Sequence, residues 1–313
     1  MPNKTLTIVS ACYNEVEVIQ NFYESIKKTI SCIDHIDIDI LIIDNASTDG
    51  TKDILEKIAS KDKNLKLIFN KRNFGHIRSP YWAIIQPSSD AVLYLASDMQ
   101  DPPDLIPKLV KKWLEGHEIV LGVKNQSKTN FIIHKIRGIY YALLKKITEH
   151  DVIPHSTGFG IYSKNFIDIV RDINDPYPYL RGMITDLGFK PELIEFTQNK
   201  REKGITKNNF YTLYDIGILG IISNSIVPLR IISFFGFVIS FVSILIGVYY
   251  FFKKIIFWSD FTAGVAPLII LTSFLFGALF LVIGFIGEYL AHILRYVNNR
   301  PIIIEEKRIN FDD

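Results

Sequence analysis

Residues 38–51 read IDILIIDNASTDGT, an aliphatic run that ends in a polar turn. The run at residues 38–43 predicts a buried strand, and the turn leads into a helical pattern at residues 51–58. The same alternation continues on both sides, with strands predicted at residues 5–11, 65–69 and 91–96 and a helix at residues 16–30. This alternation predicts an α/β domain whose mostly parallel sheet is covered on both faces.

The composition excludes several classes of protein. The chain has 313 residues, of which 48% are hydrophobic, and its 22 Phe and 15 Tyr supply enough apolar surface to exclude a disordered chain. A net charge of +2 does not create a strong positive electrostatic field that would attract nucleic acid, so we expect no nucleic-acid partner. Cys12 and Cys32 lack metal-ligand spacing and a disulfide framework, which fits a reducing compartment. Both are expected to be small buried side chains.

Two stretches near the C-terminus, residues 231–252 and 265–286, contain no charged residue. At about 1.5 Å per residue each is long enough to cross a hydrocarbon core of about 30 Å. Two buried core helices are the alternative, but these lengths and the aromatic-rich link between them favour a transmembrane hairpin. The predicted organisation is a cytoplasmic domain at residues 1–208, an interfacial amphipathic segment at 209–229, two transmembrane helices within 230–290, and a cytoplasmic tail at 291–313.

Charge predicts the orientation of this hairpin, because basic residues stay on the cytoplasmic side. The flanks carry Arg230, Arg295, Arg300, Lys307 and Arg308, whereas the link carries only Lys253 and Lys254. The apolar stretch at residues 1–12 is too short for a signal peptide. We therefore expect a multi-pass protein of the cell membrane with both termini in the cytoplasm.

Two segments next to the hairpin allow more than one interpretation. Residues 209–227 are rich in aromatic and aliphatic side chains, and they either lie in the membrane interface or pack against the cytoplasmic domain. Residues 301–304 read PIII and predict a strand that returns to a protein surface, either in this chain or in a neighbouring subunit of a homo-oligomer.

Polar turns follow three of the predicted strands. Asp44 begins one of them, and its carboxylate is suited to accept hydrogen bonds from a ribose hydroxyl or a base N–H. Residues 47–49 in the same turn also fit simple helix caps. Residues 97–103 read SDMQDPP, in which closely spaced oxygen ligands suit a hard cation such as Mg²⁺. A solvated turn that caps the helix from Leu105 explains this segment equally well, and Asp101 fits either an N-cap or a metal ligand.

The ordered set of motifs resembles a known family. The motifs are YNE at residues 13–15, IIDNASTDGT at 42–51, KRNFGH at 71–76, DMQDPP at 98–103, YLRG at 179–182, REKGITK at 201–207, PLR at 228–230, GEY at 287–289 and NRP at 299–301. Together they resemble family 2 glycosyltransferases of the GT-A fold, specifically the polyprenyl-phosphate hexosyltransferases related to dolichol-phosphate mannose synthase and the bacterial GtrB-type enzymes. The likeness covers nearly the whole chain.

The resemblance implies a role for each matching residue. Nucleotide-sugar binding is implied for Ala11, Tyr13, Glu15, Asp44, Asn73, Gly75 and His76. Asp98 and Gln100 match the turn that holds the diphosphate and a divalent metal, Mg²⁺ or Mn²⁺. Catalytic roles are implied for Asp98, Arg181 and Arg201, and acceptor-phosphate binding for Lys124, Arg137 and Lys207. A surface ion pair is the alternative for Arg181 and Arg201.

The sequence departs from the family pattern at three places. Ala96 replaces the first Asp of the usual Asp-x-Asp, and the second-strand turn has Asp44-Asn45 where relatives often have Asp-Asp. Residues 158–160 read GFG where many relatives have Asp-Phe-Arg. These changes leave the fold assignment intact, and they leave the metal geometry and the sugar open.

The implied function is inverting transfer of a hexosyl group from a UDP- or GDP-sugar to a polyprenyl phosphate, such as undecaprenyl phosphate, at the cytoplasmic face. Because a phosphate with a second pKa of about 6 is mostly dianionic at neutral pH, this acceptor needs no strong general base. The lipid-linked sugar would serve cell-surface glycan modification. One alternative is a processive polysaccharide synthase, although no Trp here follows an Arg as the Gln-x-x-Arg-Trp motif requires. The other is a non-catalytic membrane scaffold, in which Ala96 in place of the usual Asp has abolished catalysis.

Overall fold

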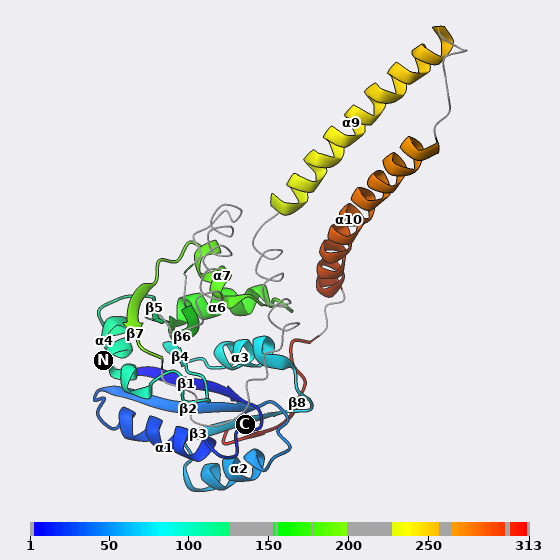
Figure 1. Ribbon diagram of the computed structural model, residues 1–313. Helices are drawn as coiled ribbons and strands as arrows, with labels where there is room; N and C mark the ends of the chain where they lie inside the picture. Colours follow the sequence, from blue (N-terminus) through cyan, green and yellow to red (C-terminus); the bar gives the residue numbers. More distant parts are fainter. Residues whose placement is uncertain are drawn as a thin grey trace.

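The computed structural model describes residues 3–124, 153, 156–176, 178–198, 227–256, 265–297 and 301–311. Within them, eight strands form one sheet in the order β7-β5-β6-β4-β1-β2-β3-β8 (Figure 1). The strands are β1 (Lys4–Cys12), β2 (Ile36–Asp44), β3 (Leu65–Asn70), β4 (Ala91–Tyr94), β5 (Ile119–Lys124), β6 (Ser156–Ser163), β7 (Glu192–Phe196) and β8 (Glu305–Ile309). Strands β4, β1, β2 and β3 run parallel, as do β5 and β7, whereas β6 and β8 are antiparallel to their neighbours. The predicted α/β fold with a mostly parallel sheet is confirmed.

Helices cover both faces of this sheet. One face carries α1 (Ile19–Ile30), α2 (Thr51–Lys61) and α4 (Ile106–Leu114), which follows the short 3₁₀ helix η1 (Pro103–Leu105). The other carries α3 (Gly75–Ile85), α6 (Lys164–Ile173) and α7 (Leu180–Asp186). Figure 1 shows these two layers on either side of the strands. The sheet is therefore the middle of three layers.

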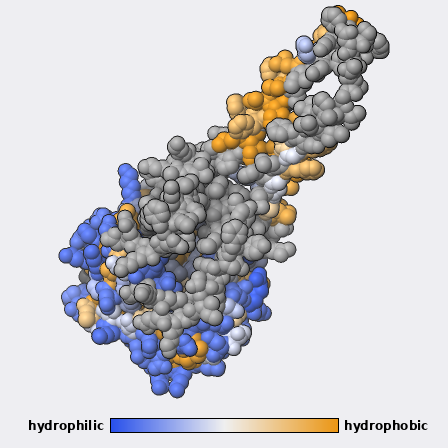
Figure 2. Space-filling model, in the orientation of Figure 1, coloured by the Kyte–Doolittle hydropathy of each residue, from blue (hydrophilic) through white to orange (hydrophobic). Residues whose placement is uncertain are grey.

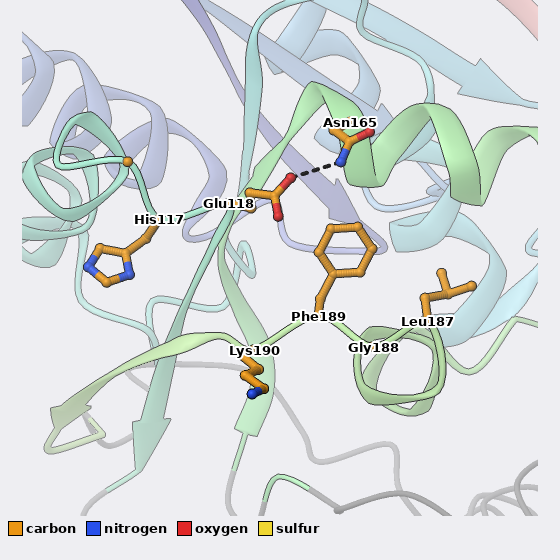
Figure 3. A pocket seen from close by; sticks show the side chains of 8 residues that line it. His117, Glu118, Asn165, Leu187, Gly188, Phe189 and Lys190 are labelled. Atoms are coloured by element: carbon orange, nitrogen blue, oxygen red, sulfur yellow. Dashed lines mark hydrogen bonds between the residues drawn. The ribbon is translucent and has the colours of Figure 1, made fainter.

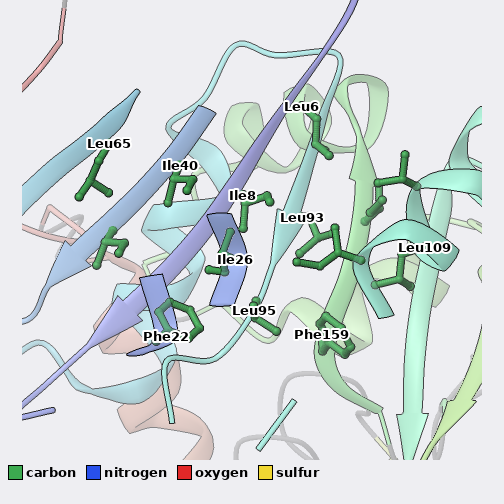
Figure 4. Close-up of a cluster of buried hydrophobic side chains, with 14 of the residues drawn as sticks. Leu6, Ile8, Phe22, Ile26, Ile40, Leu65, Leu93, Leu95, Leu109 and Phe159 are labelled. Atoms are coloured by element: carbon green, nitrogen blue, oxygen red, sulfur yellow. The ribbon is translucent and has the colours of Figure 1, made fainter. Parts of the chain in front are cut away.

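The aliphatic run of β2 explains why both faces are covered. Ile40 and Ile42 belong to the buried cluster that packs under α1 and α2, part of which Figure 4 shows. Leu41 and Ile43 belong to the cluster under α3 and α6. Because successive strand side chains point to opposite faces, a continuous aliphatic run requires a helical layer on each side.

Some predicted boundaries differ from the structure. The helix predicted from residue 16 begins at Ile19, because the carbonyl of Glu15 first accepts the N–H groups of Val18 and Ile19 in a turn, at 3.0 and 2.9 Å. Cys12 is buried as expected, but the prediction for Cys32 is wrong. Cys32 is exposed because it lies in the turn after α1.

The C-terminal segment returns to the sheet of its own chain. β8 pairs antiparallel with β3, so the strand predicted at residues 301–304 lies instead at 305–309. Ile302 and Ile303 are 3% and 5% exposed and pack in the cluster under α3 and α6. The indole Nε1 of Trp82 in α3 donates to Glu305 Oε1 at 2.7 Å. Residues 301–311 therefore complete the sheet domain, although they lie far from it in the sequence.

Two long helices, α9 (Val227–Ile256) and α10 (Val265–Val297), project away from the sheet domain (Figure 1). Taken over the described residues alone, no helix is both long enough and apolar enough to cross a membrane. Of the interfacial segment predicted at residues 209–229, residues 209–226 lie outside the described residues, and residues 227–229 form the start of α9.

Candidate active site

The carboxyl ends of β1, β2 and β4 bring three polar turns to one edge of the sheet. Cys12 lies opposite Asp44 in the β1–β2 pairing, and the Asn45 N–H donates to the Cys12 carbonyl at 2.9 Å. The Ser97 hydroxyl donates to the carbonyl of Ala11 at 3.1 Å. The structure thus brings Ala11, Asp44 and the turn of residues 96–101 together at the edge where open α/β sheets bind their ligands.

The first two turns brace each other. The Asn14 N–H donates to the Ser47 hydroxyl at 2.8 Å, and the Thr48 N–H donates to Asn14 Oδ1 at 2.8 Å. Asp49 accepts the N–H of Thr51, the first residue of α2, at 3.0 Å, and the N–H of Val16 at 3.1 Å. The N-cap of α2 is Gly50, so none of residues 47–49 is the cap itself, although Asp49 accepts the Thr51 N–H from the position before it. Tyr13 and Glu15, between these braces, are half-buried at the same edge.

Each of the three turns contains one non-glycine residue in the left-handed region. The φ angles of Asn14, Ala46 and Met99 are 56°, 62° and 60°. Such a backbone costs roughly 1–3 kcal/mol per residue and persists only where the surroundings enforce it, commonly at functional sites. This strained backbone marks the same edge as the polar side chains.

Asp44 is held from within the protein. It is 1% exposed, and Oδ2 accepts the N–H of Ser47 at 3.0 Å while Oδ1 lies 3.8 Å from the Cys12 sulfur. Burial raises the pKa of Asp44, and its hydrogen bonds with Ser47 oppose that rise. In this structure Asp44 closes the turn after β2, and its implied contact with the nucleotide stays a prediction.

Asp98 and Gln100 share the turn after β4. Asp98 is half-buried and its Oδ1 accepts the N–H of Gln100 at 3.1 Å, whereas Oδ2 has no partner among the described residues. Gln100 Oε1 accepts from Gln198 Nε2 at 3.0 Å. Gln198 was not predicted, since it lies outside the matching motifs.

Asp101 is the most deeply buried carboxylate of this turn. It is 2% exposed, its carboxylate accepts the N–H of Ala96, and its Oδ1 has no partner among the described residues. Burial raises the pKa of Asp101 to about 6, against the influence of Lys124. The N-cap interpretation is wrong, because Pro102 is the residue before η1 and Asp101 reaches back across the turn instead.

Arg181 brings a positive charge near this turn. Arg181, at the start of α7, donates to the Thr157 carbonyl at 3.2 Å, and it lies close enough to lower the pKa of Asp101 and of His76. For His76, desolvation by its surroundings is the larger cause, although the residue still reaches solvent. No ion pair of Arg181 occurs within the described ranges, so the surface ion-pair interpretation gains no support. Arg137, Arg201 and Lys207 lie outside the described residues.

The loop of residues 73–76 joins the same edge. Asn73 Oδ1 accepts from Asn45 Nδ2 at 2.9 Å and from the Gly75 N–H at 2.7 Å. Gly75 has a φ of 89°, which glycine adopts readily, and it opens α3 next to His76. Asn45 and Asn70, which hold this loop, were not predicted. The only signal for them in the sequence is their position, because Asn45 directly follows one buried strand and Asn70 is the last residue of another.

The donor atoms of the turn at residues 96–101 fit a hard divalent cation shared with a ligand. Within the described residues no group of three His, Cys, Asp or Glu side chains is arranged to hold a metal alone. Asp98 and Gln100 nevertheless present oxygen atoms, and Mg²⁺ often takes only one or two carboxylates together with waters and substrate phosphates. The site therefore fits a metal that arrives with a diphosphate.

A surface cavity of about 500 Å³ lies away from this edge (Figure 3). Its lining includes Glu118, which precedes β5, and Asn165 at the start of α6, and their side chains are joined by a 2.8 Å hydrogen bond. It contains none of the predicted site residues and opens at the amino end of β5, whereas the polar turns follow the carboxyl ends of β1, β2 and β4.

Replacing Asp101 by Asn is expected to stabilise the protein at neutral pH. The folded-state pKa of Asp101 is about 6, above the ordinary value of 3.8. Between pH 3.8 and about 6 its carboxyl group is therefore mostly protonated in the folded state and mostly ionised in the unfolded state. Stability therefore falls as the pH rises from about 4 to about 6, by up to about 3 kcal/mol. Asn keeps an acceptor for the Ala96 N–H. Thermal unfolding should show a clearly larger gain for Asp101→Asn at pH 7.5 than at pH 4.5, and equal stability of both proteins at both values would contradict the expectation.

The chain is similar to several known proteins. The model of the family described as glycosyl transferase family 2 matches residues 7–169. An uncharacterized glycosyltransferase, YkcC of Bacillus subtilis (strain 168), is 28% identical and covers 98% of this chain and 95% of its own. The SfII prophage-derived bactoprenol glucosyl transferase of Shigella flexneri is 27% identical over 96% of this chain and 97% of its own. A solved mannosyltransferase of Pyrobaculum calidifontis, in complex with GDP-Man and Mn²⁺, is 15% identical, covers 69% of this chain and 61% of its own, and has a TM-score of 0.46.

Proposed function

Because the chain belongs to glycosyl transferase family 2, we propose that it moves a hexosyl group from a nucleotide sugar to a polyprenyl phosphate, with inversion at the anomeric carbon. The observation that carries the proposal is the edge where the acidic turn of residues 96–101 faces Arg181. Relatives named bactoprenol glucosyl transferases match along almost their whole length, which supports a lipid-carried acceptor.

The residues of this edge suit a nucleophilic displacement in which the main contribution to the activation barrier is the negative charge that builds on the leaving nucleotide diphosphate. An oxygen of the acceptor phosphate forms the new bond to the anomeric carbon while the bond to the diphosphate oxygen breaks. Asp98 and Gln100 would hold Mg²⁺ or Mn²⁺, which when bound neutralises part of the diphosphate charge. Arg181 would stabilise the same charge and Lys124 would attract the acceptor phosphate, since the charges of both influence Asp101 in this turn. Since the acceptor is already anionic, no residue needs to remove a proton from it.

We also propose that α9 and α10 hold this edge at the cytoplasmic face of the cell membrane, with both termini inside. The two uncharged stretches of the sequence fall within these helices. Large apolar side chains along them are exposed, among them Phe234 at 64%, Phe241 at 63% and Phe280 at 67%, and Figure 2 shows apolar surface there. Burying such side chains in lipid removes this surface from water. Assembly into a homo-oligomer remains part of the proposal.

The test uses the full-length protein in bilayers that contain a polyprenyl phosphate, together with a panel of UDP- and GDP-sugars. We expect a lipid that carries a single hexose with one of these donors, and no product without the lipid phosphate. A long polymer would support the processive synthase instead. Absence of transfer with every donor, from protein that binds nucleotide sugar, would support the scaffold.

A further inference from the structure

We propose that Asn45 is a positioning residue for the transfer. Its amide fastens the loop of residues 73–76 to the carboxyl end of β2 and keeps the groups of that loop at the substrate edge. The inference rests on the proposed function for its catalytic consequence. The ordering of the loop is argued from the hydrogen bonds alone.

The Asn45 side chain is 4% exposed and uses its full hydrogen-bonding capacity. Its Oδ1 accepts from Asn70 Nδ2 at 3.0 Å and from the Phe74 N–H at 2.9 Å. Its Nδ2 donates to Asn73 Oδ1 at 2.9 Å and to the Gly75 carbonyl at 3.3 Å. One side chain thus joins the end of β3 to three consecutive residues of the loop.

The orientation of this amide is fixed by its backbone partners. The Phe74 N–H can only donate and the Gly75 carbonyl can only accept, so a flipped amide would lose both bonds. A carboxylate at position 45 would place an acceptor against the Gly75 carbonyl and Asn73 Oδ1. The Asn in the second-strand turn, where relatives often have Asp, is therefore the residue that this loop requires.

The loop carries groups that reach the candidate active site. Gly75 opens α3, and His76 follows at a position where the charge of Arg181 affects its pKa. Asn70 Nδ2 also donates to Ser79 Oγ in α3 at 3.3 Å. A loosened loop would release the start of α3 and expose His76 more to solvent, which removes the main cause of its lowered pKa.

The experiment compares Asn45→Asp with Asn21→Asp, which makes the same chemical change at an exposed position of α1. In full-length protein, NMR titration of the His76 imidazole should show its pKa rising toward the ordinary value of about 6.5 in Asn45→Asp only. Hydrogen exchange at the Gly75 amide should become faster. The kcat of hexosyl transfer should fall at least about tenfold, because both hydrogen bonds donated by Nδ2 are lost. This deficit should shrink at acidic pH, where a protonated Asp regains a donor.

A second pair of variants tests the direction of the bonds. Asn73 acts through its acceptor oxygen, so Asn73→Asp should leave the Gly75 exchange as in the wild type, while its added carboxylate raises the His76 pKa by charge alone. Asn73→Ala removes that acceptor at an exposed position and should change both, even if Asn45→Asp does not fold. Unchanged Gly75 exchange in Asn45→Asp, or an unchanged His76 pKa and Gly75 exchange in the uncharged variant Asn73→Ala, would overturn the proposal. These two measurements do not depend on which substrate the enzyme uses, so they remain decisive if the proposed transfer fails.

Discussion

Asp98→Asn is expected to lower the turnover number by about 10²–10³-fold while the protein stays folded, as is common when one electrostatic stabiliser of a transition state is removed. Asp98 is half-buried at the end of β4, and its Oδ2 has no partner among the described residues. Asn retains an acceptor for the Gln100 N–H, so the turn should keep its shape. What it loses is the negative charge that would hold a divalent metal against the diphosphate.

Asp104→Asn is the matched control, because Asp104 lies in the same segment but is exposed in η1. Its turnover should equal that of the wild type. The turnover of both variants should be measured over a range of Mg²⁺ and Mn²⁺ concentrations and in excess chelator. Wild-type turnover of Asp98→Asn would remove Asp98 from the mechanism, and full turnover of the wild type in chelator would leave the leaving-group charge to Arg181 and its neighbours.

The first half of the sheet was predictable because its strands are continuous aliphatic runs. The run at residues 38–43 needs two covered faces, and the alternation with helices then requires parallel pairing of β1 to β4. The edge strands carry weaker signals. β6 contains glycines within its eight residues, and β7 has only five residues with an exposed Leu193.

One departure from the family pattern has a local physical reason. Gly160 of β6 lies opposite Leu121 of the neighbouring strand β5, and a Cβ atom there would sit 2.2 Å from the Val120 carbonyl oxygen. The close approach of the two strands explains why this position tolerates no larger residue, whatever relatives have there. Strand packing in this chain therefore explains the second glycine of the GFG pattern, whereas Gly158 has a φ of 88° and no close contact.

The candidate site was only partly predictable. The strand ends and motifs indicated Asp44 and Asp98 because a polar residue that follows an aliphatic run is visible in the sequence. The burial of Asp101 depends on how the turn folds back onto Ala96, which no spacing rule gives. Asn45 and Gln198 act through partners that are distant in the sequence, so their roles appear only when the turns are seen together.

Ile303→Ala is expected to destabilise the sheet domain by about 2–5 kcal/mol, the usual cost of truncating a buried aliphatic side chain. Ile303 is 5% exposed and packs among buried residues of α3 and α6, in the segment that connects α10 to β8. The hydrogen bond between Tyr296 of α10 and Asp175 lies close to the same connection. The cost should therefore appear in the sheet domain, although the change lies beyond both long helices in the sequence.

Ile304→Ala is a closely matched control, because the neighbouring side chain is 49% exposed while its carbonyl still accepts the Lys71 N–H at 3.0 Å. It should change the free energy of unfolding by less than about 0.5 kcal/mol. Denaturant unfolding followed by the fluorescence of Trp82 and Trp113, both in the sheet domain, should separate the two variants. Equal stability of the two would mean that residues 301–311 are not part of the cooperative unit. In that case a protein ending before α9 should fold as well as the full chain, whereas packing of Ile302 and Ile303 requires that such a truncated protein be less stable.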